Sequence, residues 1–406
     1  MKVGVRKSVG LAKFGTPSSF LSFVLFLLLL LAGLQANAVS RRIRVEVLSR
    51  YNWTQCNLRS PSARVQWLKG KASFVSNLNE DQTLSLSTLS DGVRGSGLGS
   101  EKEGMQVSIQ GTSNNWIEVE GEDGVRRKFR GNLQIRKGSR GLIFFLDLTL
   151  EDYVQGVLAS EMPADAPTEA LKAMAVVIRS FAVGTASPHA SEGFDFCDLT
   201  HCQAFAGWRE DLPQMTVAVH ATHGLTLTFH GRPIQALYHS TCGGHTSPNQ
   251  KVFGGTALPY LQGVVDEPYC RGSPHYSWDS TISKTELEEV FRQGSEDAWG
   301  GPLLSIVPAV AEPNGRVFSV EAIGQTRTTL RTEKFLSLLG KKIGWNRLKS
   351  NWFTIAQEGE GFRFTGHGLG HGVGLCQWGA RGMASAGKKF DEILRFYFPG
   401  TKLLHQ

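Results

Sequence analysis

The sequence has little that would indicate a nucleic-acid-binding protein. It contains no long low-complexity tract, no clear internal repeat and little excess positive charge beyond its N-terminus. The 406 residues carry a formal net charge of +7; Lys2, Arg6, Lys7 and Lys13 supply four of these charges, and residues 1–38 hold no acidic residue, which leaves +3 for the remainder. We therefore expect no nucleic-acid partner.

The one long hydrophobic run lies near the N-terminus, over residues 20–34, between basic residues and the sequence Ala36-Asn37-Ala38. A basic segment, an apolar run and an A-x-A site are typical of a secretory signal peptide. We predict that residues 1–38 are a signal peptide, so that the protein is exported to the periplasm, the cell envelope or the medium. The run is short for a membrane span, and we expect no stable span after cleavage; an uncleaved N-terminal anchor is the alternative.

Regular alternation of strands and helices is also missing. Over residues 39–145 the pattern favours short strands, while the Gly- and Ser-rich stretch Asn77–Lys102 favours a loop. The expected strands are Arg42–Leu48, Met105–Ile109, Trp116–Glu120, Lys128–Ile135 and Leu142–Leu148. This N-terminal region is therefore predicted to be rich in β-structure.

Helices and strands mix from residue 146 onwards. Helices are expected at 149–161, 167–183, 284–292, 376–386 and 390–397, and strands at Leu225–Phe229 and Ile234–Tyr238. The sequence thus predicts an α+β fold, in which a β-rich region over 39–145 precedes a mixed α/β core over 146–406. An insertion is expected within that core at about residues 280–360.

A glutamate stands at the end of the first expected helix, where its apolar face would place a hydrophobic residue. Thr149 resembles a helix cap, and Pro163 forces Met162 out of helical geometry, so the helix should end close to Glu161. The apolar face and the negative end of the helix both disfavour the ionised carboxylate. A carboxylic acid that stays protonated near neutral pH suits general acid catalysis, while a frayed, solvated Glu161 is the alternative.

Cysteines and histidines cluster in one short segment. Cys197, His201 and Cys202 offer three ligands, and His189 lies eight residues before the first of them. Two thiolates and two imidazoles would complete a closed tetrahedral zinc site, although the spacing matches no standard zinc knuckle. A Cys197–Cys202 disulfide or free thiols are the alternatives.

Two further segments are dense in glycine, histidine and hydroxyl groups: residues 237–246 and residues 366–383. Catalytic loops from distant parts of a chain commonly converge on one cleft, so we expect the two segments to lie together and to face Glu161. The four histidines His239, His245, His367 and His371 would make a catalytic metal site only if they converged on one point.

These segments resemble the signature blocks of the sporulation stage II protein D/LytB family. The blocks are "LEDYVQGVLASEMP", "FCDLTHCQAFAGW", "ALYHSTCGGHT" and "GHGLGHGVGLCQWGARGMASAGKKFDEILRFYFPGT", in this order. The resemblance covers about residues 145–275 and 364–403. It implies either a lytic transglycosylase that acts on peptidoglycan glycan strands or, as in the LytB branch, a non-catalytic wall protein that enhances a cell-wall amidase.

The resemblance also implies roles for individual residues. Glu161 in "SEMP" matches the catalytic acid of the family, and some members bind a structural zinc through the block that here contains His189, Cys197, His201 and Cys202. No organic cofactor is implied. Residues in motif positions expected to line the glycan groove are Arg179, Gln203, Tyr238, Ser240, Gly243, Gly244, Thr246, His371 and Gln377.

One absence agrees with the lytic reaction. No second carboxylate accompanies Glu161 in the signature blocks, whereas glycosidases that use water or a covalent intermediate need two. The sequence departs from the commoner family pattern at Cys242 and Cys376, where serine is frequent. With Cys270, these residues would form a disulfide and one free thiol, or a second metal site.

Overall fold

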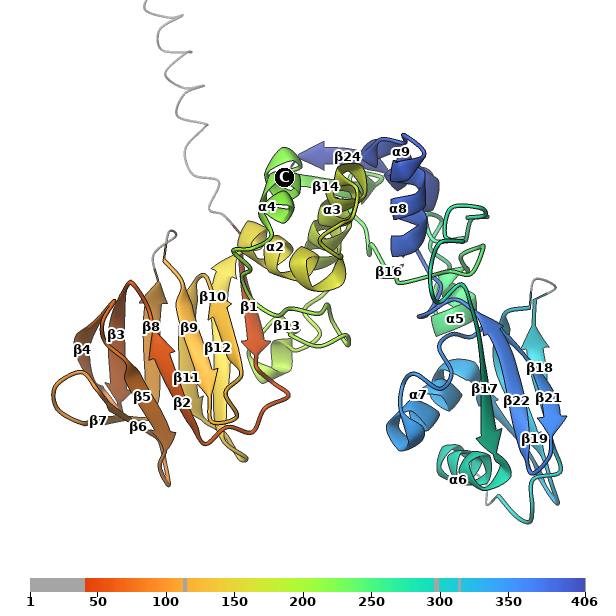
Figure 1. The fold of residues 1–406 in the computed structure, drawn as a ribbon, viewed down its shortest axis with the longest axis horizontal. Helices are drawn as coiled ribbons and strands as arrows, with labels where there is room; N and C mark the ends of the chain where they lie inside the picture. The colour runs from red at the N-terminus through yellow and green to blue at the C-terminus, as the bar shows by residue number, and fades with distance from the viewer. Residues whose placement is uncertain (1–40, 112–114, 296–298, 313–314, 406) are drawn as a thin grey trace, which may run out of the picture. The chain divides into compact units, whose positions relative to one another are not determined.

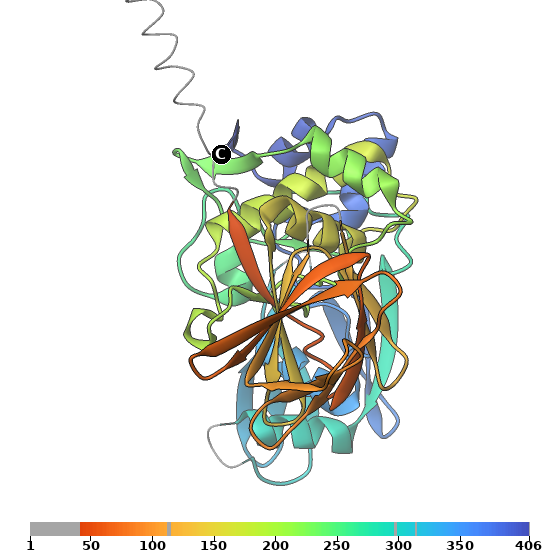
Figure 2. The same cartoon turned by 90° about the vertical axis from the view of Figure 1, so that its left-hand side faces the viewer.

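Two β-sheets built largely from the N-terminal region face each other across a shared apolar core (Figures 1 and 2). The structure is a computed structural model that describes residues 41–111, 115–295, 299–312 and 315–405. The predicted signal peptide lies outside these residues. None of the helices among the described residues is long and apolar enough to cross a membrane.

The larger sheet has seven strands and the smaller has six. In spatial order the first contains β13 (Phe196–Cys197), β1 (Arg42–Val47), β12 (Leu142–Thr149), β11 (Asn132–Lys137), β8 (Gln106–Gly111), β3 (Ser62–Lys69) and β4 (Ala72–Asn79). The second contains β10 (Arg126–Phe129), β9 (Ile117–Gly121), β2 (Gln55–Arg59), β5 (Leu84–Thr88), β6 (Val93–Ser96) and β7 (Lys102–Gly104). Gly95 of β6 lies so close to Trp67 of β3 that an added Cβ would be 2.2 Å from the ring, so the two inner faces are in direct contact.

Two expectations for this region are wrong. The stretch Asn77–Lys102 is not a loop, because Leu84, Leu86 and Val93 point alternately into the core and form β5 and β6. The expected strand Lys128–Ile135 is two strands in different sheets, β10 and β11. The extended strand conformation is interrupted at Gly131, where φ is 123° and an added Cβ would lie 2.5 Å from the backbone oxygen of Asp147.

Helix α3 (Thr168–Gly184) is the central element of the next region. It contacts helices α2 (Leu150–Glu161), α4 (Pro213–Ala221), α8 (Gln377–Ser385) and α9 (Phe390–Tyr397), together with strand β14 (Leu225–Phe229). Its whole circumference is therefore buried, beyond the single apolar stripe that the sequence predicted. Strands β15 (Arg232–Pro233) and β24 (Lys402–His405) flank β14, and short helices Ala190–Glu192 (η1) and α5 (Asn249–Phe253) complete the region.

A second apolar cluster spans residues 278–364. Strands β17 (Ser277–Ser283), β22 (Gly361–His367) and β21 (Phe353–Glu358) form one sheet, and β18 (Ser305–Ala311), β19 (Val317–Ile323) and β20 (Arg327–Arg331) form another. Helices α6 (Lys284–Gly294) and α7 (Thr332–Ile343) contribute Leu287, Phe291 and Phe335 to this cluster. The predicted α+β class is confirmed. The expected strand Leu225–Phe229 is also present, and the two C-terminal helices are present to within one or two residues. Most of the expected strand Ile234–Tyr238 is irregular instead.

A buried ion pair joins α2 to α3. Arg179 is completely buried, and its guanidinium donates to both carboxylate oxygens of Glu151 over 2.8 and 2.6 Å. It also donates to the backbone oxygen of Leu225 over 3.1 Å. Because the three partners belong to α2, α3 and β14, this one side chain fixes three elements relative to one another.

Replacing Arg179 with methionine should therefore lower the free energy of unfolding by about 3 kcal/mol, because Glu151 and the Leu225 oxygen lose their partner. Arg94→Met is the control, since Arg94 and Glu103 form an ion pair whose side chains are 46% and 43% exposed. We expect less than about 1 kcal/mol for that exposed pair. Urea denaturation of both variants measures the difference, and equal losses would contradict the structural role of Arg179.

Candidate active site

A cavity of about 840 Å³ opens beside the C-terminal end of α2. Glu161, Tyr238, Ser240, His371 and Gln377 line it, together with apolar side chains that include Phe181 and Phe253. The polar residues come from three stretches of chain that lie far apart in the sequence. The cavity therefore depends on the packing of the whole core.

A short parallel strand pair brings two of these stretches together. Strand β16 (Tyr238–His239) pairs with β23 (Leu375–Cys376), and a further bridge joins Thr241 to Leu369. The segments 237–246 and 366–383 therefore lie side by side, as the sequence predicted. Both contribute residues to the cavity that contains Glu161.

Glu161 is the last residue of α2, as expected from Pro163. The next residue, Met162, has an extended backbone with ψ of 139°, and no basic residue stands in the last turn of the helix. The carboxylate instead accepts three hydrogen bonds: from the backbone N–H of Ala204 (3.0 Å), from the Tyr238 hydroxyl (3.3 Å) and from Nε2 of Gln377 (3.3 Å). Its position is thus fixed by groups from three separate segments.

A chain of hydrogen bonds orients one of these donors. The Tyr153 hydroxyl donates to Oε1 of Gln203 over 3.1 Å, and Nε2 of Gln203 donates to the Tyr238 oxygen over 3.2 Å. Because Tyr238 accepts from Gln203, its own proton is directed at Glu161. Sequence reasoning missed Tyr153; its place in the "LEDYVQG" block is the only signal that could have indicated it.

Burial is the largest influence on the acidity of Glu161. Desolvation raises the pKa of Glu161, while the hydrogen bonds from Ala204, Gln377 and Tyr238 act in the opposite direction and only partly offset it. Glu161 is also the only carboxylate among the described residues that line the cavity. The arrangement offers one acid that can hold a proton near neutral pH and three donors that stabilise it once the proton has left.

The cavity wall also contains a neutral histidine. His371 is half-buried, and desolvation lowers its pKa to about 4. The backbone N–H of Val373 donates to Nδ1 of His371 over 3.1 Å, so the neutral ring carries its proton on Nε2. This side chain can donate a hydrogen bond without adding charge to the cavity.

Several predicted groove residues lie elsewhere. Arg179 is buried in the ion pair with Glu151. Gln203 is 1% exposed, and its side chain donates a hydrogen bond to the Tyr238 hydroxyl oxygen. The backbone at Gly243 packs against His367, where an added Cβ would be 2.7 Å away, and the Thr246 hydroxyl accepts a hydrogen bond from Val264. None of these residues, nor Gly244, is among the residues that line this cavity.

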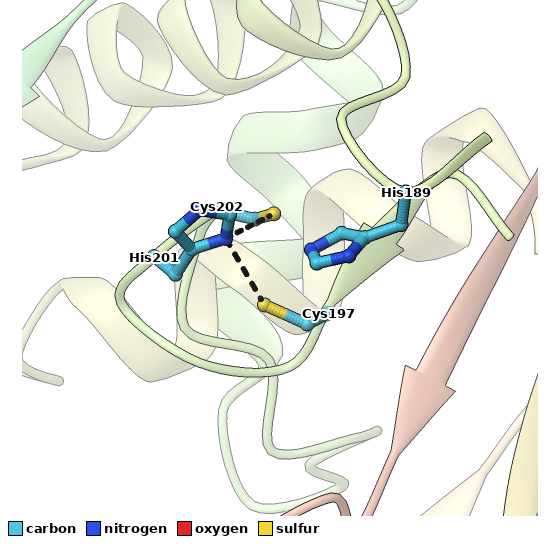
Figure 3. Close-up of side chains that lie close together, drawn as sticks. All are labelled: His189, Cys197, His201 and Cys202. Atoms are coloured by element: carbon cyan, nitrogen blue, oxygen red, sulfur yellow. Dashed lines mark hydrogen bonds between the residues drawn. The ribbon is translucent and has the colours of Figure 1, made fainter. Parts of the chain in front are cut away.

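The predicted metal ligands do converge (Figure 3). One donor atom from each of His189, Cys197, His201 and Cys202 lies within 4.8 Å of the others. Nδ1 of His201 is 3.8 Å from the Cys197 sulfur and 3.5 Å from the Cys202 sulfur. Two imidazoles and two thiols at these separations have the composition and count of a closed zinc site.

The surroundings of this cluster favour metal binding as well. Nδ1 of His189 lies 2.6 Å from a carboxylate oxygen of Glu192, which is the outer contact that commonly orients a histidine ligand. The interaction with the Cys202 thiol is the main cause that lowers the pKa of Cys197 to about 4, so the thiolate form is favoured. His201 and Cys202 also border the cavity.

The alternative four-histidine site is not formed. His239 and His371 lie together with ring centroids 5.5 Å apart, whereas His245 and His367 each pack against Trp352. Among the residues that the structure describes, two groups could hold a metal, and neither contains these histidines. The four histidines therefore do not form one metal site among the described residues.

Comparison with known proteins finds matches to two parts of the chain. Residues 140–229 match the family model described as stage II sporulation protein, and residues 270–374 match a domain of unknown function, DUF8618. Stage II sporulation protein D of Bacillus subtilis is 32% identical over 275 residues, which cover 63% of this chain and 75% of that protein. An uncharacterized protein of Brachyspira hyodysenteriae is 32% identical over 305 residues, or 74% of this chain and 80% of that protein.

A further relative has a different description. The amidase enhancer of Bacillus subtilis is 28% identical over 298 residues, which cover 62% of this chain and 40% of that protein. The family match over residues 140–229 includes Glu161 and the His/Cys cluster. The match over residues 270–374 coincides with the second apolar cluster.

Replacing Glu161 with glutamine tests the burial of its carboxyl group independently of any activity. Because the folded state raises the pKa of Glu161, the stability linked to its proton is present below the unfolded pKa and is lost as pH rises through the folded pKa. Glu161→Gln cannot ionise, so its Tm should rise relative to wild type as the pH increases above the unfolded pKa of about 4.

The control for this experiment is Glu210→Gln, because the Glu210 side chain is 70% exposed. Its Tm difference from wild type should stay constant over the same pH range. Scanning fluorimetry at a series of pH values measures both variants. A Glu161→Gln difference that does not change with pH would contradict the desolvated carboxyl.

Proposed function

The chain belongs to the stage II sporulation protein D/LytB family, and from this we propose that it is an exported lytic transglycosylase that cleaves peptidoglycan glycan strands. The observation that carries the proposal is the single carboxylic acid, Glu161, in a cavity that offers no second one among its described lining residues. Hydrolysis by two carboxylates is thereby disfavoured. A reaction whose nucleophile belongs to the substrate needs only one.

In the proposed mechanism Glu161 acts first as an acid and then as a base. It protonates the glycosidic oxygen between MurNAc and GlcNAc, and the bond from that oxygen to C1 of MurNAc breaks. The C6 hydroxyl oxygen of MurNAc then bonds to C1, and its proton passes to the Glu161 carboxylate. The product carries a 1,6-anhydro ring, no water is consumed, and Glu161 regains its proton.

The surroundings of Glu161 suit both steps. Desolvation favours the protonated acid before bond cleavage. After the proton has left, the donors Ala204, Tyr238 and Gln377 stabilise the carboxylate, and they are already in place. The hydrogen-bond chain from Tyr153 keeps the Tyr238 proton aimed at the carboxylate throughout.

The remaining cavity side chains fit a carbohydrate. Ser240, His371 and Gln377 provide neutral hydrogen-bonding groups, which match sugar hydroxyls and N-acetyl groups. The Phe253 ring is 41% exposed and lies beside His371, with ring centroids 5.3 Å apart. An exposed aromatic ring next to polar donors can pack against the face of a sugar ring.

A second function is favoured by the amidase enhancer among the relatives. In that case the cavity would bind glycan without cleaving it, and the protein would act on the wall by stimulating a cell-wall amidase. The same groove residues would then matter for binding alone. Both functions place the protein outside the cytoplasmic membrane, where peptidoglycan lies.

We also propose that His189, Cys197, His201 and Cys202 hold one structural zinc ion. Cys197 belongs to β13, which pairs with β1 in the seven-stranded sheet, whereas Cys202 directly precedes Gln203. Zinc would thus join the sheet edge to the residue that orients Tyr238. All four ligand positions would be filled by protein, so the ion would have no open position for catalysis.

Glu161→Gln should abolish the formation of 1,6-anhydroMurNAc ends, with a loss in rate of at least about 100-fold. The assay incubates mature protein with peptide-free glycan strands and detects anhydro ends by mass spectrometry. Glu210→Gln is the matched control and should keep wild-type activity. Retained activity in Glu161→Gln would remove Glu161 from the mechanism, and stimulation of an amidase by an inactive wild type would favour the enhancer function.

Removal of the proposed zinc should be visible in metal content and stability. Cys197→Ser should contain about one zinc ion per chain less than wild type and should melt at a lower temperature, because metal binding is linked to folding. Cys56→Ser is the control, since Cys56 is buried in β2 and belongs to neither potential metal group. A Cys197–Cys202 disulfide in metal-free, active protein would overturn the proposal.

A further inference from the structure

A second sulfur-rich cluster, apart from the His/Cys cluster, includes residues that adjoin two of the segments lining the cavity. Cys242, Asp266, Cys270 and Cys376 are all buried, and one donor atom from each lies within 4.8 Å of the others. The Cys242 sulfur is 3.5 Å from the Cys270 sulfur and 2.8 Å from Oδ2 of Asp266. We propose that these four residues bind a structural zinc ion through three thiolates and one carboxylate.

The separation of the two sulfurs suits a tetrahedral ion. Zinc–sulfur bonds of about 2.3 Å place two sulfur ligands about 3.8 Å apart, close to the observed 3.5 Å between Cys242 and Cys270. A disulfide would require the two sulfurs to approach to about 2.05 Å. It would also use only two of the three thiols and would leave Asp266 without a role.

Asp266 gives an independent argument for a cation. The residue is completely buried, and no lysine or arginine among the described residues forms an ion pair with it. Burying a carboxylate is costly unless it is paired or coordinates a metal ion. The Tyr397 hydroxyl donates to its Oδ1 over 2.7 Å, which leaves Oδ2 directed at the cysteines.

The backbone around the sulfurs forms the outer contacts of a thiolate site. The N–H groups of Cys242 and Gly379 donate to the Cys376 sulfur, each over 3.2 Å, and that of Gly244 donates to the Cys242 sulfur over 3.4 Å. Hydrogen bonds of this kind stabilise metal-bound ligands. The buried guanidinium of Arg316 donates to the Cys242 carbonyl over 2.6 Å and places a positive charge beside a site that would carry net negative charge.

A neighbouring glycine shows how tightly this group is built. An added Cβ at Gly379 would lie 2.0 Å from the Tyr397 hydroxyl and 2.3 Å from Oδ2 of Asp266. Only glycine therefore fits at this position of α8. The tight enclosure leaves no room for a substrate, which assigns the ion a structural role.

The site would hold the cavity wall together. Cys242 follows Ser240 by two residues in one lining segment, and Cys376 caps α8 directly before Gln377 in the other. Asp266 and Cys270 come from a third segment, and neither residue lines the cavity itself. A zinc ion here would fix the spacing between Ser240 and Gln377, and hence one of the donors to Glu161.

The test measures metal content, so it does not depend on the proposed lytic activity. Cys202→Ser, which disrupts the His/Cys cluster, should still contain about one zinc ion per chain. The double variant Cys202→Ser/Cys270→Ser should contain none, whereas Cys202→Ser/Cys56→Ser should match the single variant. Elemental analysis of the folded, desalted proteins gives the stoichiometry.

Cobalt gives a second readout on the same chain. Cys202→Ser loaded with Co²⁺ should show the absorption bands of a tetrahedral cobalt–thiolate site, and Asp266→Asn in that background should shift or weaken them. If the Cys270 variant fails to fold, the effect of Asp266→Asn on these bands decides the outcome. Cys202→Ser protein without bound zinc, or a Cys242–Cys270 disulfide found by mass spectrometry, would overturn the proposal.

Discussion

The burial of one carboxyl group at the end of a helix governs the architecture of the site. Pro163 ends α2 at Glu161, and the buried face of the helix removes this carboxyl from solvent. A desolvated carboxylate is costly unless donors reach it, and the donors come from residues 204, 238 and 377. Three segments that are remote in sequence must therefore meet at one point.

The relative position of these three segments depends on helix packing outside the cavity. Arg179 ties α2 to α3 and β14 through a buried ion pair, and α3 in turn contacts α8, the helix that begins at Gln377. A shift of α2 along α3 would move Glu161 relative to Gln377. The cost of burying a guanidinium is offset here by two carboxylate contacts and a carbonyl, which together specify one arrangement of the helices.

The sequence predicted local features better than long-range ones. The end of α2, the two C-terminal helices and the convergence of His189 with Cys197, His201 and Cys202 follow from capping, proline geometry and ligand chemistry at short range. The strands between residues 77 and 102 were missed because their buried residues are few and are separated by Gly and Ser. The motif placed Arg179 among the ligand contacts, but helix α3 is buried on all sides, which only the tertiary structure reveals. Likewise, the role of Tyr153 depends on a hydrogen bond across fifty residues.

Each of the two cysteine clusters contains a residue that is adjacent in sequence to a glutamine in the hydrogen-bond network of Glu161. Cys202 directly precedes Gln203, which orients Tyr238, and Cys376 directly precedes Gln377, which contacts Glu161. One ligand of each proposed zinc ion is thus one residue away from a glutamine in the hydrogen-bond network of Glu161. A metal ion holds the backbone of its ligands far more rigidly than apolar packing alone, because it binds at fixed lengths and angles. Two such anchors would restrict the two glutamines, and with them the balance between burial and hydrogen bonding that sets the acidity of Glu161.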